Sequence, residues 1–293
     1  MKTKEEIYSL IKSINKSLKE QKLAIPENKE PEIDFFKTLE LNGYELKDAK
    51  LGVGNKFIES KNCIVSEATT CFLKNQYSDL YKECKNNNYR LIIHFPWEST
   101  YKLSQLLNSH NSIGARECTI SLIPQQTARK FLESYHLQGD LKRDSYITYG
   151  LMYKDELIEI MCFGKPRYSK NEEWELLRLC TKSEYSVSGG ANKLLSKFIN
   201  EFNPESIVSY CDLSKFDGKV YEMLGFKLHK ISPASVHWWN GENRISDNLL
   251  RSKGADILLK TNYGKGTDNV EIIKSLGYEK YVDAGQSTYI WSK

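Results

Sequence analysis

Hydrophobic and polar positions follow a helical spacing at the start of the chain. Residues 3–22 place apolar side chains such as Ile7 and Ile11 on one face and lysines on the other, which predicts an amphipathic helix. Residues 25–34 (IPENKEPEID) contain two prolines and no periodic pattern, which is typical of a linker. We therefore expect an N-terminal helical unit at residues 1–25, followed by an irregular connection.

The region from residue 33 to residue 112 has the pattern of a small α/β domain. Residues 65–86 are predicted to be partly helical, and the apolar run at 90–95 (RLIIHF) is typical of a short buried strand. The tripeptide Pro-Trp-Glu ends that strand, and residues 101–107 return to helical spacing. This alternation predicts a compact unit with its own core.

From residue 115 to the C-terminus the pattern predicts a mixed sheet flanked by helices. Lys154 and Asp155 separate two apolar segments, which is the signal of a β-hairpin. The predicted elements are a strand at 117–123, a helix at 124–136, hairpin strands at 147–153 and 156–163, a strand at 176–180, a helix after Gly189, a strand at 204–212, a helix at 218–224, strands from 225 and at 235–239, and a final helix–strand unit over 270–291.

The turn before the predicted helix at Gly189 is a candidate phosphate site. An apolar strand, two glycines and a helix in this order leave unpaired backbone N–H groups at a helix N-terminus, where a phosphate is stabilised. Glycine has no Cβ, so Gly189 and Gly190 allow a close approach to a pyrophosphate, and Lys193 adds a flanking cation. The alternative is an ordinary tight turn. The predicted cofactor-binding residues are Val187, Ser188, Gly189, Gly190, Ala191, Asn192 and Lys193.

Composition describes a globular protein with reduced cysteines. The 293 residues are 40% hydrophobic and 27% charged, which argues against disorder, and no apolar run reaches the ~20 residues of a membrane span. The charged N-terminus does not resemble a secretory signal, so we expect a cytoplasmic protein with no membrane partner. Seven cysteines without a CxxC pair favour a reducing compartment over a zinc ribbon. The net charge of +4 permits nucleic-acid binding without requiring it.

Six segments in order and spacing resemble the C-terminal acetyltransferase-like domain of certain phage proteins. They are FLESYHLQG (131–139), YGLMYKDELIEIMCFGKPR (149–167), ELLRLC (175–180), SVSGGANKLLSKF (186–198), SYCDLSKFDGKVYEMLGF (209–226) and YVDAGQSTYIW (281–291). That group includes the Mom family of DNA-modification proteins and parts of phage homing-endonuclease-like proteins. The resemblance covers residues 115–293 and implies a GNAT-like acyltransferase fold, with an α/β class for the whole chain.

The resemblance also implies a reaction and a set of residues. Mom-type proteins modify adenine in double-stranded DNA, with acetyl-CoA or another acyl-CoA and an iron site suggested. Carried over by position, the catalytic residues would be His136, Arg178, Asp212 and Tyr221, and a metal would be held by His136, Asp212 and Tyr221. Leu137 stands where an aromatic residue often follows the histidine in the family, which weakens the ligand role of His136.

The preceding region resembles the very-short-patch-repair-like nuclease domain of phage endonucleases. Such a nuclease needs clustered acidic residues that bind a metal, together with a histidine or lysine. Glu59 and Glu67 are the plausible acids in the expected segment, and the paired acidic motifs are absent. We therefore expect a degenerate nuclease-like fold at residues 33–112 that has a DNA-binding or structural role.

Physical chemistry leaves alternatives open for three of the catalytic candidates. His136 could interact with the last carbonyls of its helix, and Asp212 could cap the turn near Ser214 or Asp217. Arg178 lies inside an apolar strand, and a buried arginine is costly unless an anion pairs with it. Asp212, Glu175 or a ligand phosphate could be that anion.

Aromatic and basic residues near the predicted site are candidates for contact with DNA. A displaced base could stack on Tyr168, Trp238 or Trp239, although such side chains more often belong to the core. Lysine and arginine side chains in the adjoining loops could contact phosphates, although exposed lysines often serve solubility alone. The predicted DNA-binding set is Lys165, Arg167, Lys170, Lys215, Lys219, Trp238 and Trp239.

Three functions are compatible with these features. The first is an acyl-CoA-dependent enzyme that modifies adenine in DNA, with the exocyclic amine reached outside the base stack. The second is a homing-endonuclease relative in which the acetyltransferase-like domain recognises DNA without modifying it. The third is a protein that binds DNA or protein and has lost both activities.

Overall fold

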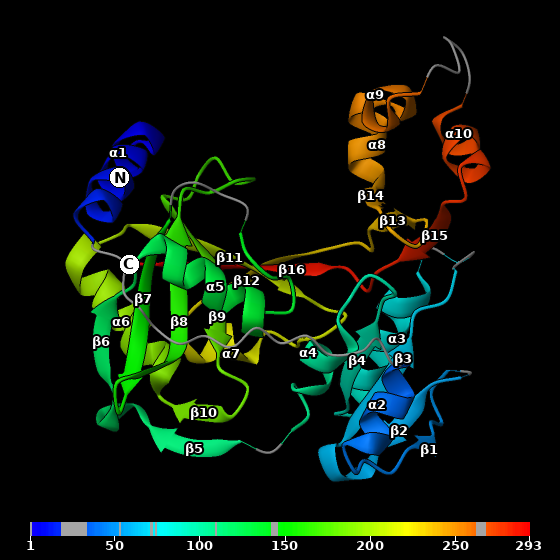
Figure 1. Ribbon diagram of the computed structural model, residues 1–293, viewed down its shortest axis with the longest axis horizontal. Coiled ribbons are helices and arrows are strands. Elements are labelled where there is room, and N and C mark those ends of the chain that lie inside the picture. The colour runs from blue at the N-terminus through cyan, green and yellow to red at the C-terminus, as the bar shows by residue number, and fades with distance from the viewer. Residues whose placement is uncertain are drawn as a thin grey trace.

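A computed structural model describes residues 2–18, 34–52, 54–70, 73, 75–108, 110–141, 146–261 and 268–293. Within these ranges the strands form a seven-stranded sheet, a four-stranded sheet, a three-stranded sheet and one separate pair. In Figure 1 the large sheet with its helices lies at one side of the molecule, and the two smaller sheets lie at the other. The chain is thus a mixed α/β protein, as its pattern predicts.

The seven-stranded sheet has the order β12-β16-β11-β9-β8-β7-β6. Neighbouring strands are antiparallel except for β9 and β11, which are parallel. Its strands are β6 (Thr119–Leu122), β7 (Ile147–Tyr153), β8 (Glu156–Gly164), β9 (Trp174–Thr181), β11 (Ser206–Asp212), β12 (Lys227–Ser232) and β16 (Gln286–Ser292).

The hairpin between β7 and β8 forms at the predicted turn. Lys154 and Asp155 both have positive φ, at 48° and 64°, and a two-residue turn of that kind matches the twist of antiparallel strands. The helices predicted around this hairpin also form, as α5 (Gln125–Tyr135), α6 (Gly190–Phe202) and α7 (Lys219–Met223). The order of helix, hairpin, strand, helix, strand, helix and strand is confirmed from β6 to β12.

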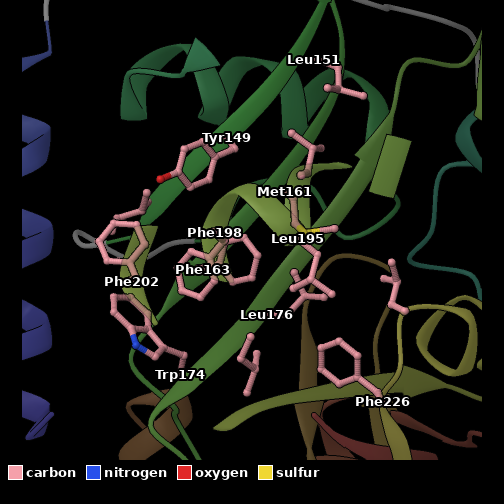
Figure 2. Close-up of a cluster of buried hydrophobic side chains, with 14 of the residues drawn as sticks. Tyr149, Leu151, Met161, Phe163, Trp174, Leu176, Leu195, Phe198, Phe202 and Phe226 are labelled. Carbon is pink, nitrogen blue, oxygen red and sulfur yellow. The ribbon is translucent and has the colours of Figure 1, made fainter. Parts of the chain in front are cut away.

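One face of the large sheet is covered by α6 and by the N-terminal helix α1 (Lys4–Ser17). Thr3 caps α1 through a capping box, and Ile7 and Ile11 are fully buried against the sheet. The core on this face is aromatic, and Figure 2 shows the rings of Phe163 and Phe198 face to face, with centroids 3.7 Å apart. The expected helix at 3–22 is therefore present to Ser17, while residues 19–33, including most of the expected linker, lie outside the described residues.

The opposite face of the sheet is covered by α5. Its buried side chains Ala128, Phe131 and Leu132 pack with side chains from β8 and β9, including Cys162 and Leu177. The six described cysteines are all free and buried. None of the helices within the described ranges is long and apolar enough to cross a lipid bilayer.

The region after α1 forms the small α/β unit that the sequence predicts. Its sheet has the order β1-β2-β3-β4, with β3 and β4 parallel. The elements are α2 (Phe35–Leu41), β1 (Lys47–Asp48), β2 (Lys56–Ile58), η1 (Glu59–Lys61), β3 (Cys63–Glu67), α3 (Gln76–Asn86), β4 (Arg90–His94) and α4 (Thr100–Ser104). Separate buried clusters lie on its two faces, one including α2 and α4 and the other including α3.

The two candidate nuclease acids lie at opposite ends of β3. Glu59 precedes the strand, is exposed and pairs with Lys47 at 2.6 Å. Glu67 ends the strand, faces His94 across the β3–β4 ladder, and accepts a hydrogen bond from the amide of Phe35. Burial and the neighbouring Asp34 raise the pKa of Glu67. The length of β3 separates the two acids, so they do not share one metal site.

The third sheet is an insertion between β12 and β16. Its elements are β13 (Val236–Trp239), β14 (Arg244–Ser246), α8 (Asp247–Lys253), α9 (Ala255–Leu259), α10 (Asn269–Ser275) and β15 (Glu279–Val282), with the strand order β14-β13-β15. The predicted strand at 235–239 therefore belongs to this small sheet and not to the large one. The segment 281–291 ends β15 and then supplies β16, which Figure 1 shows extending from the small sheets into the large one.

A buried lysine connects the large sheet to the N-terminal unit. Lys215 follows β11 and is 1% exposed, and its Nζ donates to the carbonyl of Ile93 and lies 3.0 Å from Oε2 of Glu98. The amide of Ile93 donates to the carbonyl of Ser214 at 2.8 Å. Phe95 places its ring 4.7 Å from the ammonium. Main-chain and charged contacts thus fix β11 against β4.

Removing this lysine should destabilise the protein strongly. Lys215→Met leaves the Glu98 carboxylate buried without its cation, and breaking a buried pair in this way costs roughly 3–5 kcal/mol. We expect that loss in the free energy of unfolding measured by urea denaturation. The double variant Lys215→Met/Glu98→Gln should recover most of it, and Lys82→Met, which breaks an exposed pair with Asp79, should cost less than about 1 kcal/mol. Equal losses for the two lysine variants would contradict a role for Lys215 in joining the units.

Candidate functional site

The parallel strands β9 and β11 pair over a short distance and then separate. Their ladder has two residue pairs, Ile207 with Trp174 and Val208 with Glu175. One further contact, from Oγ of Ser209 to the carbonyl of Leu176 at 3.0 Å, follows these pairs. Each strand continues its ladder with the neighbour on its other side, to β8 and to β16 respectively. The C-terminal half of β9 therefore has a backbone edge that β11 does not pair.

Helix α6 begins beside the end of β9, at the predicted glycine turn. Gly189 has φ +77°, a left-handed conformation that favours glycine, and no side chain caps the helix. In the described structure the backbone amides of Gly190, Ala191 and Asn192 donate no hydrogen bond. Ser188, Gly189 and Asn192 are exposed. This helix start presents free N–H groups to solvent, which is the property that an anion site requires.

The second glycine has a different role from the predicted one. A Cβ at Gly190 would clash with Oε2 of Glu159 and lie 2.9 Å from Cγ1 of Val187. Glu159 is on β8 and is 3% exposed. Gly190 therefore lacks a side chain because a buried carboxyl packs against it, and Gly189 is the glycine that the turn conformation requires.

Glu159 is an unpaired acid in this position. Among the described residues its carboxyl has no hydrogen bond and no ion pair, and burial raises its pKa to about 8. It is therefore neutral at neutral pH. The sequence contains one signal for it, a glutamate within the apolar run of β8, but a charged residue on a half-exposed strand gives the same pattern.

Lys193 is close to the helix start but already hydrogen-bonded. Its Nζ donates to the carbonyls of Ala115 and Cys118 at 2.8 Å and 2.6 Å. These bonds use two of its three donors and connect α6 to the segment before β6. The pair β5 (Asn111–Gly114) and β10 (Tyr185–Ser188), which the sequence pattern does not reveal, lies parallel beside the same turn.

Three of the four catalytic candidates lie near one another. Arg178 is on β9 opposite Cys162, His136 ends α5, and Tyr221 is on α7. Burial, and then the charge of Arg178, lower the pKa of His136; burial raises the pKa of Tyr221, and Arg178 partly opposes that rise. The structure thus brings an imidazole, a guanidinium and a phenol together where β9 separates from β11.

His136 is held as a neutral imidazole. Its Nδ1 accepts a hydrogen bond from the amide of Gln138 at 3.1 Å, so the proton of the neutral ring resides on Nε2. Burial, Arg178 and Lys102 lower its pKa to about 3. Its own amide continues the helix to Leu132. A base of this pKa removes a proton poorly at neutral pH.

Tyr221 reaches from α7 towards β11. Its hydroxyl donates to the carbonyl of Tyr210 at 3.3 Å, and its ring stacks on Tyr289 with centroids 5.1 Å apart. Burial raises the pKa of Tyr221 to about 12, so the phenol keeps its proton at neutral pH. It can therefore donate a proton or a hydrogen bond, but it does not serve as an anionic metal ligand.

Asp212 does not join these three residues. Its Oδ1 accepts a hydrogen bond from the amide of Ser214 at 2.9 Å, so it caps the turn after β11. The described residues contain no group of three or more His, Cys, Asp or Glu side chains that could hold a metal ion. With Asp212 engaged in the turn, the structure does not assemble the set His136, Asp212 and Tyr221 around one position.

Two members of the predicted DNA-binding set are unavailable to DNA. Lys215 is buried in the ion pair with Glu98. Trp238 is 3% exposed in the core of the inserted sheet, and its Nε1 donates to Asp247 at 3.2 Å. Trp239 is half-buried, with its ring 6.0 Å from that of Trp97. Trp238 and Trp239 are adjacent on β13, so their side chains lie on opposite faces of the strand, and each packs against other parts of the protein.

The basic residues in the loop between β8 and β9 remain at the surface. Arg167 and Lys170 are exposed, Lys165 is half-buried, and Tyr168 is 74% exposed with the Arg167 guanidinium 5.9 Å from its ring. Lys219 is exposed and pairs with Asp217 at 2.9 Å.

No protein-family model matches the sequence, and no curated protein matches it. Solved acetyltransferases are distantly similar in structure. The ribosomal-protein-S18-alanine N-acetyltransferase from Escherichia coli has 15% identity and a TM-score of 0.35, and covers 60% of this chain and 93% of that chain. A GNAT family acetyltransferase from Elizabethkingia anophelis, solved with acetyl-CoA bound, has 14% identity, a TM-score of 0.31 and coverages of 60% and 99%.

A third structure is matched over a smaller share of its length. This acetyltransferase from Bacillus anthracis str. Ames, in complex with acetyl coenzyme A, has 12% identity and a TM-score of 0.29. The match covers 52% of this chain and 65% of that chain, just under two thirds. The protein itself is a mixed α/β protein with one large sheet and additional smaller sheets.

The buried carboxyl of Glu159 predicts a pH dependence of stability. Its pKa rises from the ordinary 4.5 to about 8 on folding, so the native state binds more protons than the unfolded state between these values. The stability that the protonated carboxyl of Glu159 contributes is fully present below pH 4.5 and is lost as the pH rises to 8. We expect Glu159→Gln to remove this component, and to raise the free energy of unfolding by more than ~1 kcal/mol at pH 8.

Urea denaturation of wild type and variant across pH 5 to 9 measures the effect. Glu156→Gln, on the same strand, is the matched control, because Glu156 pairs with Lys182 and its pKa is lowered. If the free energies of unfolding of wild type and Glu159→Gln differ by the same amount at every pH in this range, a raised pKa for Glu159 is contradicted.

Proposed function

We propose that the protein is an acyl-CoA-dependent acyltransferase. The observation that carries the proposal is the free N-terminus of α6, where three unpaired backbone amides follow a left-handed glycine. Such an end attracts a pyrophosphate. The segment SVSGGANK, which resembles the acyl-CoA-binding turn of GNAT-type enzymes, supplies these amides.

The strand edge supports the same ligand for a separate reason. An unpaired strand edge binds extended chains that carry amide groups, because its N–H and C=O groups need partners. The pantetheine arm of coenzyme A is an extended chain with two amides, and the acyl group follows at its end. A ligand that joins a pyrophosphate to such an arm suits a protein that has both a free helix N-terminus and a free strand edge.

The side chains near the edge suit acyl transfer to an amine. The neutral phenol of Tyr221 can donate a proton to a departing thiolate, since its pKa of about 12 keeps it protonated. His136, with a pKa of about 3, is better suited to accept a hydrogen bond than to act as the general base.

We also propose, as the acyl acceptor, the one expected from the sequence, which is adenine in double-stranded DNA. What supports it is the exposed loop with Arg167, Lys170 and the accessible ring of Tyr168, because a basic segment with an aromatic side chain suits a nucleic acid. An electrophoretic mobility shift of duplex DNA that weakens with added salt, and that Arg167→Ala/Lys170→Ala abolishes, would test it.

Acetyl-CoA binding by isothermal titration calorimetry tests the proposed function. Asn192 is exposed in the first turn of α6, so Asn192→Asp should stabilise the helix while its carboxylate opposes a bound pyrophosphate. We expect acetyl-CoA affinity to fall about tenfold or more, a difference of about 1.4 kcal/mol, without loss of thermal stability.

Asn200→Asp is the matched control. Asn200 is exposed on the same helix, eight residues or about 12 Å further along, which exceeds the screening length of about 8 Å at physiological salt. It should bind acetyl-CoA as the wild type does. A wild-type protein that binds no acetyl-CoA at millimolar ligand, or two variants with equal affinity, would overturn the assignment of α6 to the cofactor.

A further inference from the structure

The guanidinium of Arg178 is a charge that the chain itself leaves without an anion. Its Nη1 donates to the carbonyl of the adjacent Leu177 at 2.9 Å. Its Nε is buried and has no hydrogen-bond partner, and within the described ranges Arg178 forms no ion pair. An uncompensated buried charge costs several kcal/mol, and arginine cannot escape the cost by losing its proton.

The carboxylate that the sequence suggests as a partner has another role. Glu175 lies on the same strand and is 7% exposed, but its Oε2 accepts a hydrogen bond from the amide of Arg167 at 2.7 Å. Glu175 raises the pKa of Arg178 less than Cys162 and Tyr221 do, and Arg167 lowers it. The other candidate, Asp212, caps the turn after β11. Neither acid neutralises the guanidinium directly.

The groups that face Arg178 from other elements add no negative charge. From α5 comes the neutral imidazole of His136, from α7 the neutral phenol of Tyr221, and from β8 the thiol of Cys162. Burial raises the pKa of the Cys162 thiol to about 12, so it is not a thiolate at neutral pH. The site is therefore positive in the absence of a ligand.

We propose that Arg178 binds a carboxylate of the acyl acceptor, so that the acceptors are amines that carry a carboxylate group. The inference rests on the proposed acyl transfer for the reaction and on Arg178 for the substrate class. With Nη1 bonded to Leu177 and Nε closed to solvent, Nη2 is the donor that a carboxylate oxygen can reach. One guanidinium balances one negative charge.

A small ligand can reach this position. Arg178 as a residue is half-buried although its Nε is not accessible, so part of the guanidinium meets solvent. It lies on β9 beyond the last pair with β11, on the strand whose free edge we assign to the acyl donor. A carboxylate bound here would hold the amine of the same molecule beside the transferred acyl group.

Acetate is the probe for the carboxylate site, used with the full-length protein. The ¹H–¹⁵N signal of the buried Arg178 Nε reports binding, and Arg178→Lys identifies that signal by removing it. We expect a saturable shift with acetate, no shift with the neutral isostere acetamide, and at least tenfold weaker acetate binding to Arg178→Lys by competition calorimetry. Arg251→Lys, which changes an exposed arginine of α8 outside the site, should bind acetate as the wild type does.

Each other outcome overturns the inference. If dimethyl phosphate binds more tightly than acetate, as measured by the shift of the Nε signal, the site is assigned to a phosphodiester. The absence of an acetate shift up to roughly 100 mM, where a millimolar Kd is saturated, would exclude the carboxylate. Should Arg178→Lys fail to fold, the wild-type contrast between acetate and acetamide decides. Acetate binding needs no acyl-CoA, so a protein that binds acetyl-CoA and not acetate would keep the proposed function and lose this inference.

Transfer assays extend the test to the acceptor. Release of the coenzyme A thiol from acetyl-CoA is compared for a mixture of the common amino acids and a matched mixture of their decarboxylated amines. We expect at least tenfold faster release with the amino acids, and loss of that preference in Arg178→Lys. Equal or faster release with the amines, or none with either mixture, would show that the acceptor is not selected by its carboxylate.

Discussion

The brevity of the β9–β11 ladder determines how the rest of the large sheet is arranged. Two residue pairs hold the parallel strands together, while each strand has a much longer ladder on its other side. The sheet is therefore continuous at one end of these strands and divided at the other. Two features accompany this division: the edge of β9 is free beyond its pairs with β11, and Arg178 on β9 interacts electrostatically with Tyr221 on α7.

Such a division needs support, and distant parts of the chain supply it. The last strand, β16, pairs with the whole of β11 and also with β12, so β11 does not depend on β9 for its position. Past the end of β11, Lys215 is fixed by Glu98 and Ile93 of the N-terminal unit. Oγ of Ser214 accepts a hydrogen bond from the amide of Ala284 in the segment that leads into β16. The extra sheets thus fix the far side of the gap, which the two ladder pairs alone would hold weakly.

Local signals in the sequence predicted the elements around the site. They did not predict which side chains are buried by contacts with distant parts of the chain. The turn at Lys154 and Asp155 and the helix after Gly189 depend on a few neighbouring residues, and both form as predicted. The sequence left open whether Trp238 and Trp239 stack on a base or belong to the core, because nothing nearby in the sequence shows that β13 pairs with β15 forty or more residues later. Lys215 read as a surface cation for a similar reason, since its partner Glu98 is 117 residues away. Periodicity records which face of an element is apolar, but it does not record which element covers that face.

Glu159 and Arg178, two ionisable groups of the large sheet, respond to burial in different ways. Glu159 lies against Gly190 on the α6 side without a partner, and its pKa of about 8 lets it bind a proton and become neutral. Arg178 is close to His136 on the α5 side, and its guanidinium keeps its proton even though burial lowers its pKa. An unpaired buried acid can therefore persist in a protein as a structural feature that responds to pH. An unpaired buried guanidinium stays charged, and none of the described acids pairs with Arg178. The carboxylate that we propose for the acceptor supplies that missing charge.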